Sequence, residues 1–440
     1  MTIFLEIGNC CFKLKIINYI MSNHSGAFFK NVTTLAAGTT IAQIITILVS
    51  PLLSRLFTPE DFALFAAFTS IAGLFSIVAT GKYELAIILP DEDREAAQIL
   101  FAIILLVGIV SIFSALVLIV LSKFSPACNL ILSNNLLVYF IVFVFCSANL
   151  EALRYYFVRI KQFKAISYRT ILGSIITVSL NIIGGYFFNI PAMFVISTTV
   201  AQVLCTVLFV YFIKKSIKFS WFNLKTVKMV LFKYRKFPFF TMPGQLLNSF
   251  TGSLPILVLP ALYSQSEIGQ FAFVQKIVGI PMTIIGGSVA QVFFQKFSSI
   301  RRNEQKSVFV KTFFYLFVFI TVCAIPCVLA AVPIFNVVFG AKWLSAAQLA
   351  QILAPMYIAQ FAISNISGAV YIINEKLKTD FALQILRLVL VAAAFLIAFV
   401  QNVSFVYSIV FFSVAMIAWY FTTLIVSLMI IKNNENNCLK

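Results

Sequence analysis

Long apolar segments recur along the whole chain, and they constrain its fold more than any other feature. About twelve stretches, each of roughly 20 mostly apolar residues and so long enough to cross a bilayer as a helix, are separated by short polar connections. Hydrophobic residues make up 61% of the chain and charged residues 10%, whereas a soluble domain is about half apolar and about a quarter charged. Backbone polar groups in lipid must be satisfied within helices. The sequence therefore predicts an all-α membrane protein.

We place the predicted spans from hydropathy and from the turn residues between them. They cover residues 32–57, 62–80, 98–121, 136–158, 168–188, 191–213, 238–262, 268–295, 308–332, 346–372, 379–400 and 404–431. The predicted domains are an N-terminal tail at 1–30, a six-helix lobe at 31–213, a basic linker at 214–237, a second six-helix lobe at 238–431 and a tail at 432–440. Residues 1–20 are expected to be either an upstream-start extension or a dispensable tail, because Met21 opens a segment typical of the start of such a chain.

The distribution of charge predicts the orientation of the chain. The net charge is +18, from 32 Lys+Arg against 14 Asp+Glu. Lys276 and Arg387 fall within spans, and the basic residues predicted on the outer side are Arg55, Lys123 and Lys342. Because cytoplasmic loops carry the excess of Lys and Arg, both termini are expected in the cytoplasm. The same rule accounts for the basic charge without a nucleic-acid partner.

The longest inner connection, 214–237, holds eight basic residues and no acidic residue, with aromatic residues between them. Such a segment predicts an amphipathic helix at the membrane surface, where its cations meet anionic lipid headgroups. Membrane lipids are therefore expected partners of this linker.

The two predicted lobes resemble each other in sequence. A shift of 206 residues sets 56–73 against 262–279 and aligns identical residues, among them Phe65 with Phe271. The match places the first two spans on the seventh and eighth, as a duplication of six spans requires. Because six is even, both copies have the same orientation, which is the parallel repeat of two-lobed transporters with a site between the lobes.

Two short motifs indicate which protein family the chain resembles. The segment 54–62, SRLFTPEDF, lies at the first predicted outer turn, and 81–87, GKYELAI, opens the first inner loop. On these residues the chain resembles the polysaccharide flippases of the multidrug/oligosaccharidyl-lipid/polysaccharide exporter superfamily, of the O-antigen and capsule type. Ala63 departs from the Gly that this family usually carries there. The first motif also has a local explanation, because Thr58 and Pro59 followed by two acids form a typical helix start.

The resemblance implies a function. It implies translocation of lipid-linked oligosaccharide repeat units across the bacterial inner membrane, with undecaprenyl pyrophosphate as the lipid carrier, for lipopolysaccharide O-antigen, capsular or exopolysaccharide synthesis. By this resemblance the chain is a transporter that works by alternating access, not an enzyme, and needs no cofactor. A polysaccharide polymerase and a chain-length regulator are further expected partners.

Two basic residues inside spans are candidates for contact with an anionic substrate. Lys276 lies about 12 Å from the outer end of its predicted helix, and Arg387 about 12 Å from the inner end of its own, from the rise per residue. A charge in the membrane interior is costly unless it is hydrated or paired. Each side chain therefore either faces a water-filled cavity, where it meets pyrophosphate or an acidic sugar, or reaches an internal partner or the membrane interface.

Polar residues at helical spacing are candidate glycan contacts. Gln43 belongs to a polar stripe on the first span, Asn248 to a proline-containing seventh span, and Gln291 to the face of the eighth span that carries Lys276. Polar stripes in lipid-embedded helices face protein or water, so these residues either bond neighbouring helices or line a hydrophilic cavity. The prolines of the seventh span also predict a kinked helix.

Glu151 is the one carboxylate predicted well inside a span, and it is the candidate for coupling to a proton or cation. Arg154 lies one turn away, so a local ion pair is the alternative. Arg154 and Arg159, at the inner end of the fourth span, are candidates for capture of the substrate headgroup.

Two other classes of protein remain as alternatives. A drug or cation exporter of the same superfamily tends to carry a carboxylate in the first span of a lobe, and the first and seventh spans contain none. A polysaccharide polymerase or membrane glycosyltransferase needs outer loops with catalytic charges, and the outer loops predicted here are short. The sequence holds one His and no phosphate-binding glycine loop, so it predicts no metal site and no nucleotide site.

Overall fold

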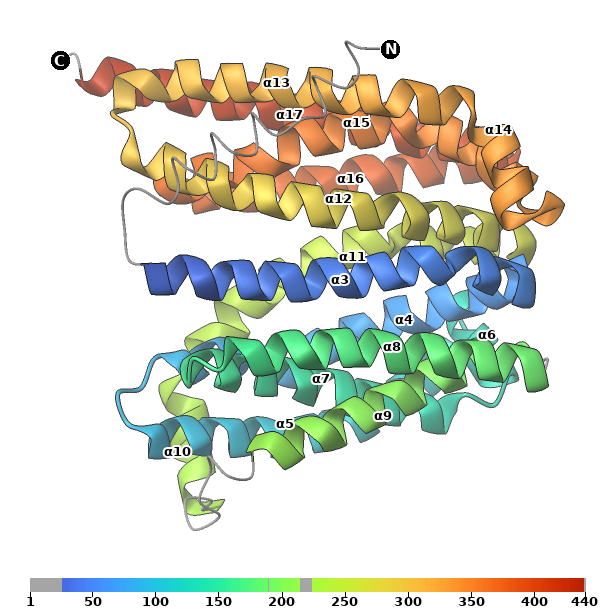
Figure 1. The fold of residues 1–440 in the computed structure, drawn as a ribbon, viewed down its shortest axis with the longest axis horizontal. Coiled ribbons are helices and arrows are strands. Elements are labelled where there is room, and N and C mark those ends of the chain that lie inside the picture. The colour runs from blue at the N-terminus through green and yellow to red at the C-terminus, as the bar shows by residue number, and fades with distance from the viewer. Residues whose placement is uncertain (1–25, 189, 214–223, 439–440) are drawn as a thin grey trace.

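A computed structural model describes residues 26–188, 190–213 and 224–438. The predicted extension at 1–20 and the first part of the basic linker, 214–223, lie outside the described residues. Within the described part the chain is helical and contains no strand. Figure 1 shows the long helices side by side along one direction, an arrangement that suits helices crossing a membrane. The all-α membrane fold predicted from the apolar segments is confirmed.

Each lobe is built from long helices. The first lobe contains α3 Gly26–Leu56, α4 Pro59–Thr80, α5 Asp93–Leu121, α7 Leu137–Arg159, α8 Phe163–Phe187 and α9 Met193–Ile213. The second contains α11 Met242–Val258, α12 Gln265–Ser299, α13 Arg302–Leu329, α15 Leu344–Ile373, α16 Leu377–Val400 and α17 Phe405–Cys438. Short helices join them, namely η1 Tyr83–Ile88, α6 Pro126–Ser133, α10 Leu224–Lys233, α14 Ala331–Ile334, η5 Phe335–Phe339 and η6 Ala341–Trp343.

The seventh predicted span differs from the others. In the described part of the chain, 11 helices are long and apolar enough to cross a membrane, against about twelve spans expected from the sequence. In the remaining pass, a π-helix at Phe237–Thr241, then α11, then a 3-10 helix at Leu259–Ala261 follow one another without a loop. Proline removes a backbone donor and clashes with the preceding turn, and each of the three segments contains proline, namely Pro238 in the π-helix, Pro243 and Pro255 in α11 and Pro260 in the 3-10 helix.

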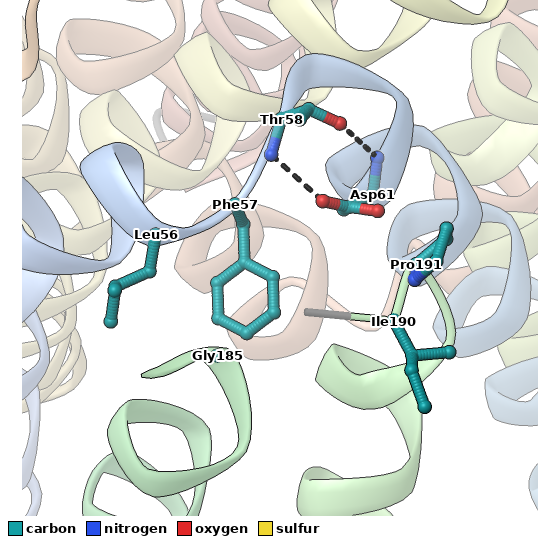
Figure 2. A pocket seen from close by; sticks show the side chains of 7 residues that line it. All are labelled: Leu56, Phe57, Thr58, Asp61, Gly185, Ile190 and Pro191. Carbon is teal, nitrogen blue, oxygen red and sulfur yellow. Dashed lines mark hydrogen bonds between the residues drawn. The ribbon is translucent and has the colours of Figure 1, made fainter. Parts of the chain in front are cut away.

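The second helix of each lobe begins with the same hydrogen-bonded cap. Before α4, the N–H of Thr58 donates to Asp61 Oδ2 at 2.8 Å, and the N–H of Asp61 donates to Thr58 Oγ1 at 3.3 Å (Figure 2). Ser264 and Glu267 form the equivalent capping box before α12. Because the two caps correspond under the shift of 206 residues, the sequence match between the lobes reflects a repeated structure.

The two lobes lie side by side, the first in blue and green and the second in yellow to red (Figure 1). Within the lobes, α3 packs on α8, and α12 and α17 pack on α15. Between the lobes, the main contacts join α4 to α12 and α11. The start of α3 and the end of α17 lie at one end of the bundle, where α10 runs across the direction of the long helices. We call this end inner and the opposite end outer, following the orientation predicted from the charges.

Candidate functional site

The lobes are joined at their outer ends by hydrogen bonds to the last turn of α3. Lys342 Nζ, from η6 of the second lobe, donates to the carbonyl oxygens of Phe57 at 2.7 Å and Arg55 at 3.3 Å. The indole Nε1 of Trp343 donates to the carbonyl oxygen of Ser54 at 2.9 Å. The last carbonyls of a helix have no partner within that helix. The second lobe therefore caps the C-terminal end of α3.

The first lobe returns two hydrogen bonds to η5 of the second lobe. The Ser54 hydroxyl donates to the carbonyl oxygen of Phe339 at 3.2 Å, and Arg55 Nη2 donates to that of Val337 at 3.3 Å. The side chain of Ser54 is fully buried. The motif at 54–62 thus supplies contacts between the lobes in addition to the helix start that the sequence predicts.

Directly beneath these bonds, α12 approaches α4 at backbone distance. A Cβ atom on Gly269 would collide with the backbone carbonyl of Pro59. The adjacent side chain of Gln270 is buried and ties down the start of α15, since its Nε2 donates to the Lys342 carbonyl at 2.6 Å and its Oε1 accepts from the Ala346 N–H at 3.0 Å. The outer end is therefore closed between α4 and α12. We call the approach of Gly269 to Pro59, together with the hydrogen bonds between the end of α3 and the η5–η6 segment, the outer closure.

Lys276, on α12, places its ammonium group among phenyl rings of the first lobe. Nζ lies 4.8 Å from the ring centroid of Phe194 on α9, and 5.2 Å and 5.4 Å from those of Phe65 and Phe62 on α4. These distances fall within the range of cation–π attraction. In the part of the chain that the structure describes, none of the ion pairs involves Lys276. The internal partner of this cation is aromatic, not acidic.

Arg387, on α16, meets residues of two other helices of the second lobe. Its Nη1 donates to Asn248 Oδ1 on α11 at 3.0 Å, and its guanidinium lies 5.1 Å from the ring centroid of Trp419 on α17. Arg387 Nε and Gln384 Oε1 are buried and have no hydrogen-bond partner among the described residues. The structure thus brings together two predicted substrate contacts, Arg387 and Asn248, and leaves one donor and one acceptor unused beside them.

The predicted glycan contacts on α3 and α12 face the boundary between the lobes. Thr283 Oγ1 of α12 donates to Gln43 Oε1 of α3 at 2.9 Å. Gln291 lies two turns beyond Thr283 toward the inner end, and its side chain is exposed. Because an exposed polar face is unfavourable against lipid, this face of α12 indicates a hydrophilic surface between the lobes. Gln43 bonds a neighbouring helix, whereas contact of the exposed Gln291 with a glycan stays a prediction.

Glu151 and Arg154 form a local ion pair on α7. Arg154 Nε donates to Glu151 Oε2 at 2.9 Å, and Nη2 bonds the other carboxylate oxygen. The guanidinium also lies 4.8 Å from the ring centroid of Tyr155. The local pair that the sequence offers as one alternative is therefore the arrangement found, with the two side chains 40% and 39% exposed.

Arg169 is a further cation near this pair, and it is not among the candidate site residues predicted from the sequence. Arg169, on α8, lies 5.4 Å from the ring centroid of Phe209, and its buried Nε has no hydrogen-bond partner among the described residues. It interacts electrostatically with both Glu151 and Arg154. The predicted fifth span begins at residue 168, which leaves Arg169 at a loop boundary. A helix that begins at Phe163 instead places it about 9 Å inside.

Arg159 holds the first inner loop against α7. Its guanidinium bonds Asp93 Oδ1 at 3.1 and 3.2 Å, and it also donates to the carbonyl oxygens of Ile87, Pro90 and Asp91. These contacts match the N–H donors of an arginine, and the side chain is only 10% exposed. Capture of a substrate headgroup by Arg159 stays a prediction, and it requires these bonds to be exchanged.

Polar contacts attach α10 to the first lobe. Lys233 pairs with Glu95, and the Tyr234 hydroxyl donates to the same carboxylate at 2.9 Å. The hydroxyl of Tyr83, in the motif at 81–87, donates to the carbonyl oxygen of Leu231 at 3.0 Å. The bond to Glu95 raises the pKa of the Lys233 ammonium, and burial, then Glu95, raises the pKa of the Tyr234 hydroxyl. The second motif therefore contributes to the docking of the linker.

A small cavity lies beside the cap of α4 at the outer end. Its volume is about 110 Å³, and it is lined by Leu56, Phe57, Thr58, Asp61, Gly185, Ile190 and Pro191 (Figure 2). A water molecule occupies about 30 Å³ in the liquid, so this space suits a few water molecules and no oligosaccharide. Within the described ranges, no group of three or more His, Cys, Asp or Glu side chains is arranged to hold a metal ion.

The fold is similar to that of known membrane transporters. The chain matches the inward-facing conformation of a multidrug resistance MATE family transporter of the MOP superfamily, with a TM-score of 0.68 and 14% identity over 94% of this chain and 96% of that one. It matches the lipid II flippase MurJ, in an inward closed conformation, with a TM-score of 0.67 and 16% identity over 91% and 90%. For a MOP superfamily transporter from Pyrococcus furiosus, the values are 0.57 and 14% over 92% and 96%. At identities this low, the TM-scores show a shared two-lobed fold and nothing beyond the fold.

Sequence relationships identify the family. No curated protein sequence matches the chain. A family model described as "Polysaccharide biosynthesis protein" matches residues 52–348. The matched stretch is more than half of the 440 residues, and it contains the outer closure, the linker and Lys276. The chain therefore belongs to this family of polysaccharide biosynthesis proteins.

Proposed function

We propose that the protein flips lipid-linked oligosaccharide repeat units across the bacterial inner membrane, with undecaprenyl pyrophosphate as the lipid carrier and both termini in the cytoplasm. Its family and its two-lobed transporter fold support a flippase-type role. The observation that carries the proposal is a pair of interior cations, Lys276 and Arg387, that have no carboxylate partner among the described residues. A diphosphate is the kind of ligand that such cations suit.

A flippase must move a diphosphate and a polar glycan through hydrocarbon while the lipid tail stays in it. Arg387 lies about 15 Å from the inner end of α16, with an unused donor beside an unused acceptor of Gln384. A guanidinium binds phosphate oxygens as a two-pronged donor. We assign the diphosphate or an acidic sugar to the interior cations, and glycan hydroxyls to Asn248, Gln291 and Gln43.

In this proposal, residues at the inner end act earlier in transport than the interior cations do. Arg154 and Arg159 meet the headgroup as it enters from the cytoplasmic leaflet, and Glu151 is the site of coupling to a proton or cation. Because Glu151 and Arg154 bond each other, a headgroup phosphate that attracts Arg154 would free the carboxylate. A polysaccharide polymerase and a chain-length regulator are proposed to receive the product on the outer side.

A drug or cation exporter is the second candidate, since the fold is shared with a MATE family transporter. An exporter of cations needs a negative site, and α3 and α11 contain no Asp or Glu. Lys276 and Gln43 at the lobe boundary, and Arg387 with Asn248 inside the second lobe, are instead basic and amide side chains. These observations favour an anionic substrate.

The experiment is a flipping assay with the purified protein in vesicles. A fluorescent undecaprenyl-pyrophosphate oligosaccharide in both leaflets is bleached from outside by a reductant that does not cross the bilayer. The protein is expected to expose the inner-leaflet pool within the assay, and a Lys276→Ala/Arg387→Ala double variant is expected to leave about half of the lipid protected. Efflux of a cationic dye without any lipid flipping would instead establish the exporter.

A further inference from the structure

The rings around Lys276 hold one another in place. Phe194 stacks on Phe65 with a centroid separation of 4.2 Å and on Phe57 with 4.7 Å, and it meets Phe62 edge to face at 5.0 Å. Phe62 and Phe194 are 2% and 1% exposed. We call Phe62, Phe65 and Phe194 the phenyl cage. Because its rings pack against each other, the cage does not depend on the lysine for its shape.

The cage and the lysine belong to different lobes. The rings come from α4 and α9 of the first lobe, whereas Lys276 comes from α12 of the second. Side chains on a helix lean toward its N-terminus, so Lys276 leans toward the outer closure, where Gly269 meets Pro59. Separation of α4 from α12 at the outer end would draw the ammonium out of the cage.

The rings are a weaker partner for the ammonium than a phosphate is. A ring face attracts a cation through its quadrupole, whereas a phosphate offers full negative charge and acceptors for the three N–H donors of a lysine. In the part of the chain that the structure describes, Lys276 has no ion pair that would compete with such an anion.

We propose that the phenyl cage positions Lys276 in the outer-closed state, and that an anionic group of the substrate competes with the rings for its ammonium. Transfer of the ammonium from the rings to phosphate oxygens removes an attraction between the lobes at the outer end, and so favours outward opening. The cage is inferred from contacts alone, and the identity of the competing anion rests on the proposed function.

The test measures the separation of the lobes at the outer end. Spin labels are placed on cysteines at the exposed positions Ser133, in the first lobe, and Gln401, in the second, after replacement of the native cysteines by serine. Phe65→Leu and Lys276→Gln are expected to raise the outer-open population several-fold without substrate. Lys276→Arg, which keeps a cation for the rings, is expected to stay close to the parent protein.

Phe75→Leu is the matched control. Phe75 is a half-buried phenyl on α4, as Phe65 is, and it packs edge to face on Phe140 with centroids 5.7 Å apart. Its removal creates a similar defect outside the cage and should leave the outer end closed. Unchanged populations in both Phe65→Leu and Lys276→Gln would overturn the cage, and so would an equal opening by Phe75→Leu.

Undecaprenyl pyrophosphate tests the competing anion in the same labelled protein. It is expected to raise the outer-open population with Lys276 present and to have no effect in the Lys276→Gln variant. Inorganic pyrophosphate, added alone, separates the effect of the phosphates from that of the lipid. If the cage variants open the outer end but neither probe shifts the parent protein, the cage stands and the exchange with an anionic substrate is refuted.

Discussion

Cations in the membrane-spanning part divide into those that bond acids and those that do not. Arg159 serves Asp93 and three carbonyl groups, so its removal leaves acceptors of the protein itself unsatisfied. Lys276 and Arg387 have aromatic and amide partners, so their removal leaves no unpaired acid. The first kind of substitution should affect stability as well as the proposed capture of the headgroup, whereas the second kind should affect transport alone.

Lys276→Ala and Arg387→Ala are each expected to lower polysaccharide export about tenfold or more, because a hydrogen bond to a charged group contributes roughly 1.5–3 kcal/mol. Lys276→Arg should retain more export than Lys276→Gln, since charge matters more than shape for a phosphate. Surface polysaccharide in a flippase-null strain measures export, and immunoblots of membranes measure abundance. Normal export by both alanine variants, or loss of both proteins from the membrane, would remove the support for an anion site.

Arg159→Ala is expected to lower stability by about 1–3 kcal/mol, because the partly buried carbonyl oxygens of Ile87 and Pro90 lose their donor. Thermal unfolding of the purified protein in detergent measures the effect as a fall in Tm. Arg94→Ala, at an exposed position in the first turn of α5, is the control and should unfold at the parent temperature. A variant at Arg159 that unfolds like the control would show that the loop is held by other contacts.

Sequence spacing could identify Lys276 and Arg387 as interior cations, because each lies far from the ends of an apolar span. It could not reveal the phenyl cage, since the rings come from helices remote from Lys276 in the chain and any of the 49 phenylalanines could have been a neighbour. Arg169 escaped prediction for a different reason. A helix boundary that differs by a few residues decides whether a cation lies inside the membrane or in a loop.

At the scale of helices, the matching caps determine the first residues of α4 and α12. The caps fix where each helix starts, and Gly269 then allows the two backbones to touch. The caps were predictable, because a hydroxyl followed three residues later by an acid has a local cause. The contact at Gly269 was not, because it depends on how two distant helices cross.

Gly269→Ala is expected to destabilise the outer-closed state by about 1–3 kcal/mol, the usual cost of overpacking, because the added methyl group meets the Pro59 carbonyl. Cysteine labelling at the outer end by a membrane-impermeant maleimide should therefore rise. Gly279→Ala is the matched control on the same helix, since a Cβ atom there meets nothing within 4 Å. Equal labelling of the two variants would contradict a tight crossing at Gly269.

The seventh pass shows the limit of hydropathy at this scale. The apolar run predicted one helix over 238–262, and the structure has three helical segments there. Hydropathy measures whether a segment suits lipid, whereas proline decides which backbone hydrogen bonds can form. The kink was predictable from the prolines, but the π-helical turn at its inner end was not.

At the scale of the whole molecule, alternating access requires the outer closure to open and reform. A bis-maleimide that links Arg55→Cys in the first lobe to Val337→Cys in the second, in a background without native cysteines, is expected to abolish flipping. The two positions are chosen because Arg55 bonds the Val337 carbonyl at 3.3 Å. Single-cysteine variants treated with the reagent should stay active. Full activity of the linked protein would rule out opening at this end.

The orientation of the molecule is tested by reporter fusions. A periplasm-dependent phosphatase fused after residue 440 should be inactive, whereas the same reporter inserted at Lys123 should be active, because the basic residues concentrate on the inner connections. A reporter that is active only in the cytoplasm provides the complement at both sites. Phosphatase activity at the C-terminus would reverse the assignment of inner and outer ends.

The residues proposed to hold the diphosphate, Lys276 on α12 and Arg387 on α16, both belong to the second lobe. Under the shift of 206 residues, Ser70 stands on α4 where Lys276 stands on α12, so the repeat has copied the helix but not the charge. When the lobes rock apart, a bound diphosphate would travel with the second lobe. The second lobe then carries the bound diphosphate. The substrate loses its contacts with the first lobe on one side of the membrane and regains contacts with it on the other.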